Sequence, residues 1–497
     1  MLLISFVALY LLASVALGLY AARRVKNTAD YALAGRSLPL IMIVTTTFAT
    51  WFGSETVLGI PSKFVEGGLG KTVEDPFGAA FCLIFVGMFF ARKLYNMNLL
   101  TIGDFYRQRY GKGVEIFSAT VILISYLGWV AAQITALGLV FHMLSGGAMS
   151  TVQGMVLGTA IVFVYTVFGG MWSVAFTDFL QMIIIIIGLS LIAWFAADLA
   201  GGADKVVSYA ADKDMFNFFP EPTLHAWLFW LGAAITIMIG SIPQQDVFQR
   251  VMSAKDADTS VRGPIIGGIA YLLFAFVPMF IGLAAFVIMP EVANALLAED
   301  SQKVLPTLVM DRMPPWLQVM FFGALLAAIM STASATLLAP STTFVENILR
   351  NFRTLSDRSS LRAMRVTVTV FTLCVLVYSI RMEGTPIYEL VAMAYQFPVV
   401  GAFWPLVCGL YWQRSTTEGA IWSIVLGMST WAILEFTPLG EVFPSVLGGF
   451  ILAGIGMVVG SLLPTRGNVA HRARTASHGP HSHAGHHAAQ GAHHAHR

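Results

Sequence analysis

The segment VTTTFATWFGSETVLGIP, residues 44–61, is an apolar run that Gly53 and the serine after it interrupt near the middle. A comparable interruption, at Gly240 and Pro243, divides AITIMIGSIPQQDVFQR, residues 234–250. Membrane helices that unwind near the midplane of the bilayer expose backbone groups that bind ions and solutes, and paired interruptions in two halves of a chain indicate such a site. The two segments therefore predict broken helices that hold a binding site. Intact membrane helices also contain glycine and proline, which is the alternative explanation.

The composition of the chain supports a location in a lipid bilayer. Of its 497 residues, 57% are hydrophobic and 11% are charged, and its mean hydropathy is +0.74, whereas an average soluble domain has about 25% charged residues. So few charges cannot cover a water-facing surface, which excludes a soluble enzyme, a nucleic-acid-binding protein and a disordered chain. The apolar segments contain no nucleophile–base pair or metal motif, so we expect neither enzymatic activity nor a cofactor.

Thirteen apolar segments are each long enough to cross a bilayer. Backbone amides in hydrocarbon must bond within their own segment, and the segments lack the alternation of barrel strands, so we predict an all-α polytopic membrane protein with 13 transmembrane helices. Spans 2 to 6 and 7 to 11 form two five-helix blocks of opposite orientation, the pattern of an inverted repeat. The predicted spans are residues 2–22, 39–60, 77–96, 115–144, 150–169, 173–198, 224–248, 264–289, 316–346, 364–381, 386–412, 417–435 and 443–463.

The basic residues gather on one side of these spans. Alternate loops hold 22 of the 29 lysines and arginines, and Arg250 is among them, in the loop after the seventh span. Cytoplasmic loops of membrane proteins are enriched in basic residues. We therefore predict that the protein lies in the inner (plasma) membrane and that this side faces the cytoplasm. Thirteen spans then place the N-terminus outside and the C-terminus inside.

The end of the chain differs from the transmembrane domain, which we assign to residues 1–465. Residues 466–497 are rich in Ala, Gly and His, and nine of the eleven histidines lie there. Such a segment cannot form a core, so we predict a disordered cytoplasmic tail. Loose binding of zinc, nickel or copper by its imidazoles is the alternative; we predict no other metal site beyond sodium.

The ninth span contains FFGALLAAIMSTASATLLAPSTTF, residues 321–344. Ser331 and Thr332 follow Ala328 by three and four residues, so their hydroxyls lie on one helical face near the Ala328 carbonyl. These oxygens, with two carbonyls from an unwound second span, would give a hard monovalent cation an oxygen shell without formal charge. This favours sodium over zinc or copper. Close helix packing by small residues is the alternative.

Two carboxylates and two tryptophans lie near the predicted breaks. Asp178 and Glu55 are costly to bury in a membrane, so they are candidates for binding an ion, a proton or a cationic solute. A role at a helix start is the alternative for both. The ring faces of Trp51 and Trp129 attract quaternary ammonium groups, although most membrane tryptophans serve packing.

Three motifs resemble the sodium:solute symporter family: AGRSL at residues 34–38, GGMWSVAFTD at 169–178 and AAIMSTASATLL at 327–338. With the thirteen-span layout, the resemblance covers residues 1–465. It implies a leucine-transporter-type core of two inverted five-helix repeats, with one helix before it and two after it. It also implies that inward sodium flow drives solute uptake by alternating access.

The resemblance implies the sodium ligands as well. The main sodium site would use the carbonyls of Ala49, Phe52 and Ala328 and the hydroxyls of Ser331 and Thr332. A second site, which some members have, would use Asp178, Ser331 and Ser334. Where those members place another serine, this chain has Ala335.

Within the family, residues 45–59 and 240–255 look most similar to the high-affinity choline transporter branch. Trp51 and Trp129 match aromatic positions that contact choline in that branch. Two further aromatic positions are replaced here, a Trp by Gln244 and a Tyr by Ala79.

We therefore expect a sodium-coupled symporter that imports a small organic solute, with choline or a related amine as the first candidate. Its partners would be sodium, the solute and the lipid bilayer. The solute is expected to bind among Trp51, Glu55, Trp129, Ser241 and Gln244. Two alternatives stay open: a proton-coupled carrier of a polar solute or carboxylate, working through Asp178 or Glu55, and a membrane solute sensor.

Overall fold

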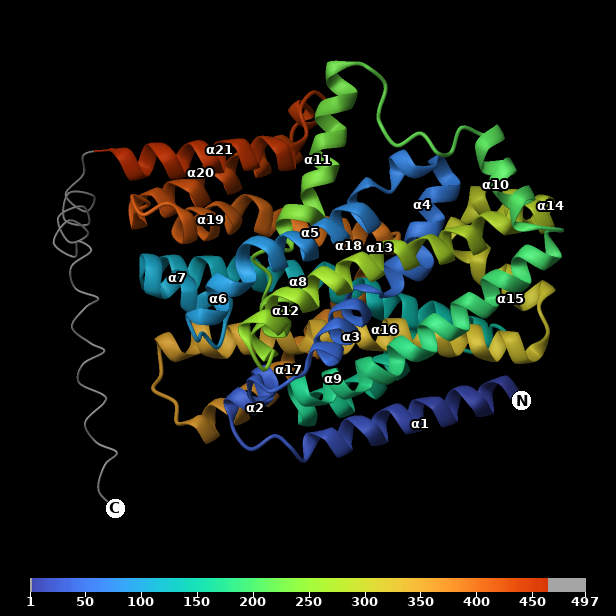
Figure 1. The fold of residues 1–497 in the computed structure, drawn as a ribbon, viewed down its shortest axis with the longest axis horizontal. Coiled ribbons are helices and arrows are strands. Elements are labelled where there is room, and N and C mark those ends of the chain that lie inside the picture. Colours follow the sequence, from blue (N-terminus) through green and yellow to red (C-terminus); the bar gives the residue numbers. More distant parts are fainter. Residues whose placement is uncertain (1, 464–497) are drawn as a thin grey trace.

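The structure is a computed structural model, and it describes residues 2–463. The His-rich tail lies outside this range. Apart from one isolated bridge between Leu38 and Ala254, the described residues form helices and their connections (Figure 1). This agrees with the prediction of an all-α protein.

The elements differ greatly in length. The longer helices are α1 (Leu2–Ala22), α8 (Lys112–Leu144), α9 (Thr151–Leu199), α11 (Leu224–Gly240), α13 (Ala257–Ile288), α16 (Pro315–Thr343), α17 (Asp357–Arg381), α18 (Ile387–Gly401), α20 (Thr417–Glu435) and α21 (Ser445–Leu462). The shorter helices are α2 (Thr28–Leu33), α3 (Leu40–Trp51), α4 (Ile60–Gly67), α5 (Ala79–Phe85), α6 (Arg92–Asn96), α7 (Ile102–Tyr110), α10 (Ala203–Asp212), α12 (Gln245–Ser253), α14 (Pro290–Glu299), α15 (Val304–Arg312) and α19 (Phe403–Tyr411). Short helical turns are η1 (Ala34–Arg36), η2 (Glu55–Gly59), η3 (Leu69–Lys71), η4 (Val73–Gly78), η5 (Val86–Ala91), η6 (Ser301–Lys303), η7 (Phe344–Ile348), η8 (Leu349–Asn351) and η9 (Pro438–Glu441).

Many of these helices are long and apolar enough to cross a membrane. Among the described residues there are 9 such helices, or up to 11 if each of two bent pairs is counted as one span. The predicted number of 13 therefore stays a prediction, as does the repeat layout. The predicted spans 150–169 and 173–198 lie in the single helix α9, whose backbone leaves helical geometry at Gly170 (φ 51°, ψ −145°).

The predicted interruption of the second span is present. Helix α3 ends at Trp51, where Phe52 leaves helical geometry (φ −87°, ψ 67°), and the chain resumes helical turns in η2 and α4. Gly53 lies in the gap, and Pro61 is tolerated because it occupies the first turn of α4, where its missing N–H is not needed.

The predicted interruption of the seventh span is present as well. Helix α11 ends at Gly240, and α12 begins at Gln245 after a bend of 44°. Pro243 lies between them, and its ring disfavours a helical conformation in the residue before it. All nine residues of α12 are buried.

Helix α16 forms the centre of the molecule. From Phe321 to Thr343 nearly every residue is buried, and the helix packs against α3, α8 and α9 (Figure 1). Its small residues allow these neighbours to approach closely. The break in α3 therefore lies against a rigid, polar segment of α16.

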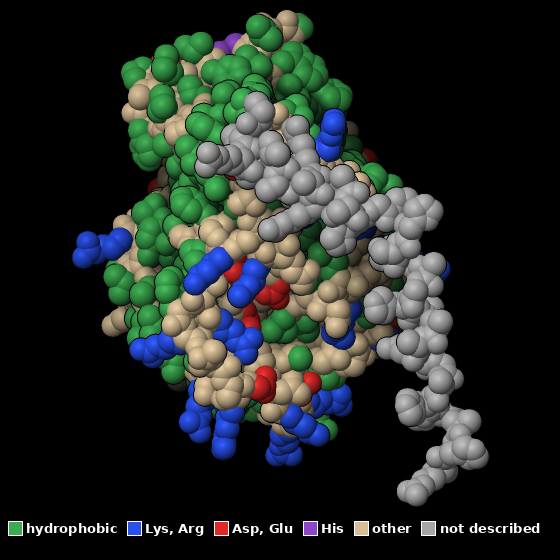
Figure 2. Space-filling view, turned by 90° about the vertical axis from the view of Figure 1, so that its left-hand side faces the viewer, with side chains coloured by type: hydrophobic (Ala, Val, Ile, Leu, Met, Phe, Trp, Pro, Cys, Tyr) green, Lys and Arg blue, Asp and Glu red, His purple; other side chains and the backbone are tan. Residues whose placement is uncertain are grey.

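Basic side chains gather on one face of the molecule. Figure 2 shows lysine and arginine side chains gathered over the lower part of the face that lies on the left in Figure 1. The N-terminus of α1 lies at the opposite end (Figure 1). The predicted orientation, with the basic side in the cytoplasm, stays a prediction.

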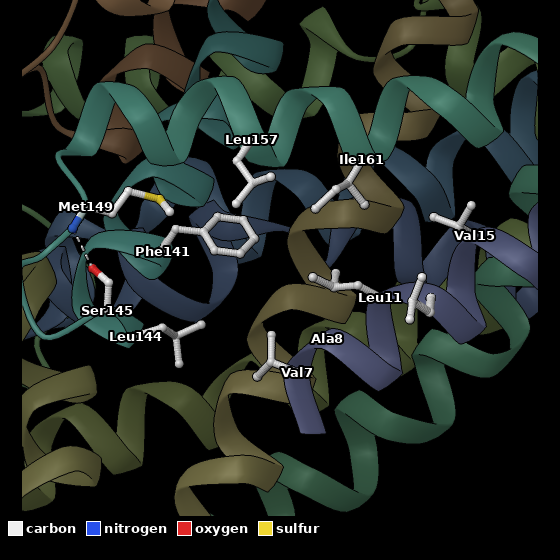
Figure 3. A pocket seen from close by; sticks show the side chains of 11 residues that line it. Val7, Ala8, Leu11, Val15, Phe141, Leu144, Ser145, Met149, Leu157 and Ile161 are labelled. Atoms are coloured by element: carbon white, nitrogen blue, oxygen red, sulfur yellow. Dashed lines mark hydrogen bonds between the residues drawn. The ribbon is translucent and has the colours of Figure 1, made fainter. Parts of the chain in front are cut away.

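A mainly apolar cavity lies at the edge of the fold. It has a volume of about 470 Å³ and is enclosed by α1, the end of α8 and α9 (Figure 3). Val7, Leu11, Phe141, Leu157 and Ile161 line it, and the Ser145 hydroxyl bonds the Met149 amide at 2.9 Å. None of the predicted site residues lines this cavity, which is therefore separate from the candidate site at the helix breaks.

Candidate functional site

Asp178 gathers hydroxyl groups from two helices beside the break. The Ser331 hydroxyl of α16 donates to its Oδ1 at 2.6 Å, and the Thr46 hydroxyl of α3 donates to its Oδ2 at 2.5 Å. The Asp178 side chain is fully buried. The second predicted sodium site therefore has its carboxylate in contact with Ser331, whereas the Ser334 hydroxyl bonds the Ser331 carbonyl within its own helix at 2.9 Å.

Thr332 connects α16 directly to the end of α3. Its hydroxyl donates to the Thr50 carbonyl at 2.7 Å. A Cβ atom on Gly53 would lie 2.5 Å from this hydroxyl oxygen and 2.5 Å from the Glu55 Oε2. The absence of a side chain at Gly53 thus lets the Thr332 hydroxyl and the Glu55 carboxylate approach each other.

We expect Gly53→Ala to weaken sodium binding, because the new methyl group must push Thr332 and Glu55 apart. Overpacking of this kind costs about 1–3 kcal/mol, which corresponds to about a tenfold loss of affinity or more. The measurement is the sodium concentration that gives half-maximal thermal stabilisation of the purified protein.

Gly323→Ala in α16 is the matched control for that experiment. A Cβ at Gly323 meets no atom within 4 Å, so this variant should keep the wild-type sodium response. If Gly53→Ala also keeps it, the close approach at Gly53 has no role in sodium binding.

Arg250 lies in the same polar region, and its position corrects one prediction. The charge pattern assigned it to a cytoplasmic loop, but it belongs to the buried helix α12 and is only 2% exposed. Its Nε donates to the Thr50 hydroxyl at 3.0 Å and its Nη1 to the Asp246 carbonyl at 2.6 Å. The prediction failed because the chain continues after the 44° bend as the buried helix α12, which extends past Arg250 to Ser253.

Three aromatic rings pack against one another beside the broken α3. Trp51 and Trp129 meet edge to face with centroids 5.7 Å apart, and Tyr395 of α18 lies 6.1 Å from the first ring and 5.3 Å from the second. We call Trp51, Trp129 and Tyr395 the aromatic cage. Its third member was not predicted from the sequence; the only local signal is its position three residues before Pro398, inside a span.

The Glu55 carboxylate borders the aromatic cage. Trp129 donates its Nε1–H to Oε1 at 3.0 Å, and Gln133 donates from Nε2 to Oε2 at 2.7 Å. The Gln133 carbonyl oxygen accepts the Ser54 amide of the broken segment at 3.0 Å. Both carboxylate oxygens are thus held by N–H groups, which can only donate, and this matches an ionised carboxylate. Gln133 was missed because it lies among the apolar residues of α8.

The interrupted seventh span supplies polar atoms without partners. Among the described residues, the Ser241 hydroxyl, the Gln244 carbonyl oxygen and the Tyr395 hydroxyl are buried and have no hydrogen-bond partner. Gln244 also donates to the Ser125 hydroxyl at 2.8 Å. Buried polar groups are normally satisfied, so unsatisfied groups of this kind mark a place where a ligand or water completes the bonding.

The structure thus brings together most of the predicted residues. Trp51, Glu55 and Trp129 are in one connected group, and Ser331, Thr332 and Asp178 are in the neighbouring one. The oxygen-rich group suits a hard cation such as sodium. Among residues 2–463, no group of three or more His, Cys, Asp and Glu side chains could hold another metal ion.

Comparisons with known proteins place this architecture. The model of the sodium:solute symporter family matches residues 31–427. The high affinity choline transporter 1 of Homo sapiens is 27% identical over 86% of this chain and 75% of its own length, and the sodium/proline symporter of Escherichia coli is 27% identical over 95% of each.

Solved structures agree in fold. The substrate-bound outward-open state of a Na⁺-coupled sialic acid symporter superposes with a TM-score of 0.80 at 19% identity, covering 95% of this chain and 98% of the other. MhsT in complex with L-phenylalanine superposes with a TM-score of 0.56 at 15% identity, covering 84% of this chain and 97% of the other. The family match spans most of the sequence and both helix breaks, and the chain belongs to the sodium:solute symporter family.

Proposed function

We propose that this protein is a sodium-coupled symporter that imports a small, positively charged organic solute, with choline or a related amine as the first candidate. One observation carries the proposal: the Glu55 carboxylate contacts the aromatic cage through Trp129 and approaches the Thr332 hydroxyl across Gly53. A single negative group therefore lies between the candidate solute site and the candidate sodium site.

The sodium ion would bind between α3 and α16. Its ligands would be the carbonyls of the interrupted α3 and of α16, together with two hydroxyls of α16: Ala49, Phe52, Ala328, Ser331 and Thr332. Phe52 supports this assignment because its backbone is non-helical, so its carbonyl is not committed to a regular helix. Asp178, Ser331 and Ser334 remain a proposal for a second ion.

The solute would bind within the aromatic cage. Ring faces stabilise an organic cation by about 2 kcal/mol or more when it is desolvated, and Glu55 supplies the compensating charge. Ser241 and Gln244 have unpartnered oxygen atoms that can bond a hydroxyl or an N–H of the solute. Gln244 and Ala79 stand where the choline transporter branch has aromatic residues. Tyr395 would supply part of the aromatic surface that is lost at these two positions.

Coupling would follow from the shared elements. An ion shifts a conformational equilibrium only by binding one state more tightly, and sodium bound between α3 and α16 would order the broken segment that also positions Trp51 and Glu55. Sodium and solute would then each raise the affinity for the other, because such coupling is reciprocal. We place the basic end in the cytoplasm and the N-terminus outside the plasma membrane.

The test is thermal stabilisation of the purified protein, measured in sodium and in potassium. The ligands are choline, betaine, single amino acids and short carboxylates, each at one concentration. We expect an amine to raise the melting temperature only in sodium, since a ligand that binds the folded state stabilises it by mass action. Stabilisation that is equal in both salts would contradict sodium coupling.

Uptake by proteoliposomes separates the two alternatives. Solute uptake that persists without sodium and follows a pH gradient would favour a proton-coupled carrier. Ligand binding without any uptake would favour a solute sensor.

A further inference from the structure

Asp75 is a buried carboxylate that the proposed transport mechanism does not use. It lies in η4 and is 3% exposed. The Tyr271 hydroxyl oxygen of α13 is within hydrogen-bonding distance of its Oδ1. The same Tyr271 oxygen lies 3.0 Å from the Thr56 hydroxyl, which donates to the Trp51 carbonyl at 3.1 Å. Four oxygens thus form a chain from Asp75 to the end of the broken helix α3.

Counting protons along this chain shows that one is missing. The chain has three oxygen–oxygen contacts, and each needs one proton to be a hydrogen bond. Thr56 and Tyr271 each carry a single hydroxyl proton, and a carbonyl carries none. If Thr56 donates to Trp51 and Tyr271 donates to Asp75, the contact between the two hydroxyls has no proton. A third proton has to come from the Asp75 carboxyl group.

No neighbouring group can supply this proton instead. Tyr388 of α18 faces Asp75, but its oxygen accepts the Asp75 backbone amide at 3.2 Å and is not a member of the oxygen chain. Lys63, which acts electrostatically on the neighbouring Glu74, pairs with Glu66 and Glu389 at 3.3 and 3.1 Å. Neither these residues nor the backbone can supply the missing proton, so it has to come from Asp75.

The charges around Asp75 favour the same conclusion. The charged groups that act on it are Glu55 and Glu74, and both are negative. A buried carboxylate without a cationic partner is costly and is normally neutralised. Glu55 differs because N–H donors hold both of its oxygens, whereas the side-chain partner of Asp75 is the Tyr271 hydroxyl, which also contacts Thr56.

We propose that Asp75 holds a proton in this conformation, and that this proton completes a hydrogen-bond relay through Tyr271 and Thr56 to the Trp51 carbonyl of the broken helix. The proton site does not depend on the proposed sodium coupling. Loss of the proton to water would leave one contact of the relay without hydrogen, which loosens the hold of Thr56 on the broken segment. Glu74 lines a polar cavity of about 600 Å³ with Glu435 and Glu441, which gives water access to the residue beside Asp75.

Infrared spectroscopy of the purified protein tests this directly, because a protonated carboxyl group has a carbonyl stretch that a carboxylate lacks. The measurement is made at neutral pH without sodium or solute, in H₂O and in D₂O, on wild type, Asp75→Asn and Glu55→Gln. We expect a deuterium-sensitive band that Asp75→Asn removes and Glu55→Gln keeps. A band that survives in Asp75→Asn, or no such band in wild type, would overturn the proposal.

Thr56→Val gives a second test that does not rely on the Asn variant. Without the Thr56 hydroxyl, Tyr271 needs no extra proton, so Asp75 should bind its proton about tenfold less tightly and the band should disappear at a lower pH. An unchanged pH midpoint would contradict the relay. Neither spectrum is recorded with sodium or solute. If sodium-driven uptake fails, the infrared result for Asp75 is therefore unaffected.

Discussion

Replacement of Thr332 with valine should abolish most sodium-driven uptake at physiological sodium concentration. The Thr332 hydroxyl is a proposed sodium ligand, and it also donates to the Thr50 carbonyl at 2.7 Å. Valine keeps the shape and the branching of threonine but has no oxygen. Contacts between a polar group and a charge contribute about 1.5–3 kcal/mol, so we expect the apparent sodium affinity to fall about 10- to 100-fold.

The measurement for Thr332→Val is the sodium dependence of uptake by proteoliposomes, together with direct binding of radioactive sodium to the purified protein. Thr336→Val is the matched control on the same helix. The Thr336 hydroxyl bonds the Thr332 carbonyl within α16 at 2.7 Å, so its loss should leave sodium affinity close to wild type. Equal effects of both substitutions would mean that Thr332 acts through helix packing rather than as a ligand.

Replacement of Glu55 with glutamine should have the largest effect on the solute. The amide has no charge to balance an ammonium group inside the aromatic cage. It also has only one oxygen, whereas both Trp129 and Gln133 present N–H groups to the carboxylate at 3.0 and 2.7 Å. One of these donors loses its acceptor, which is costly in a buried site. We therefore expect the affinity for a cationic solute to fall by about 100-fold or more.

The solute for this experiment is the amine that stabilises the wild-type protein in sodium. Its concentration dependence of uptake is measured for Glu55→Gln and for Glu299→Gln, an exposed carboxylate that pairs with Lys303 at 3.2 Å. The second variant should behave as wild type. If Glu55→Gln retains wild-type affinity, the transported solute does not use the carboxylate, and the assignment of a cationic solute is wrong.

The positions of the two helix breaks could be predicted from the sequence, because they depend on local chemistry. Gly53 follows the last helical turn of α3, and Pro243 cannot continue α11, whatever surrounds them. The shared face of Ser331 and Thr332 is equally local, since it follows from helical spacing alone. The apolar segments were also correct as helices, although the structure joins two of them in α9.

The partners of the polar groups could not be predicted in this way. Arg250 was read as a loop residue because its charge is unusual in a membrane, and only the bend before α12 brings it to Thr50. Tyr395 looks like an ordinary aromatic residue of a span until α18 places it beside Trp51 and Trp129. Nothing near Asp75 in the sequence indicates that Tyr271 will be its partner.

The amino-acid sequence by itself determined that the chain lies in a membrane, where its helices unwind and which helical face has hydroxyl groups. These properties depend on hydropathy, on the backbone preferences of glycine and proline, and on the helical repeat of about 3.6 residues per turn, all of which are local. Tertiary structure alone decided that Glu55 lies between an aromatic cage and Thr332, and that Asp75 ends a relay. Such contacts join residues far apart in the chain, and packing of whole helices, rather than any local preference, sets which buried polar atoms meet.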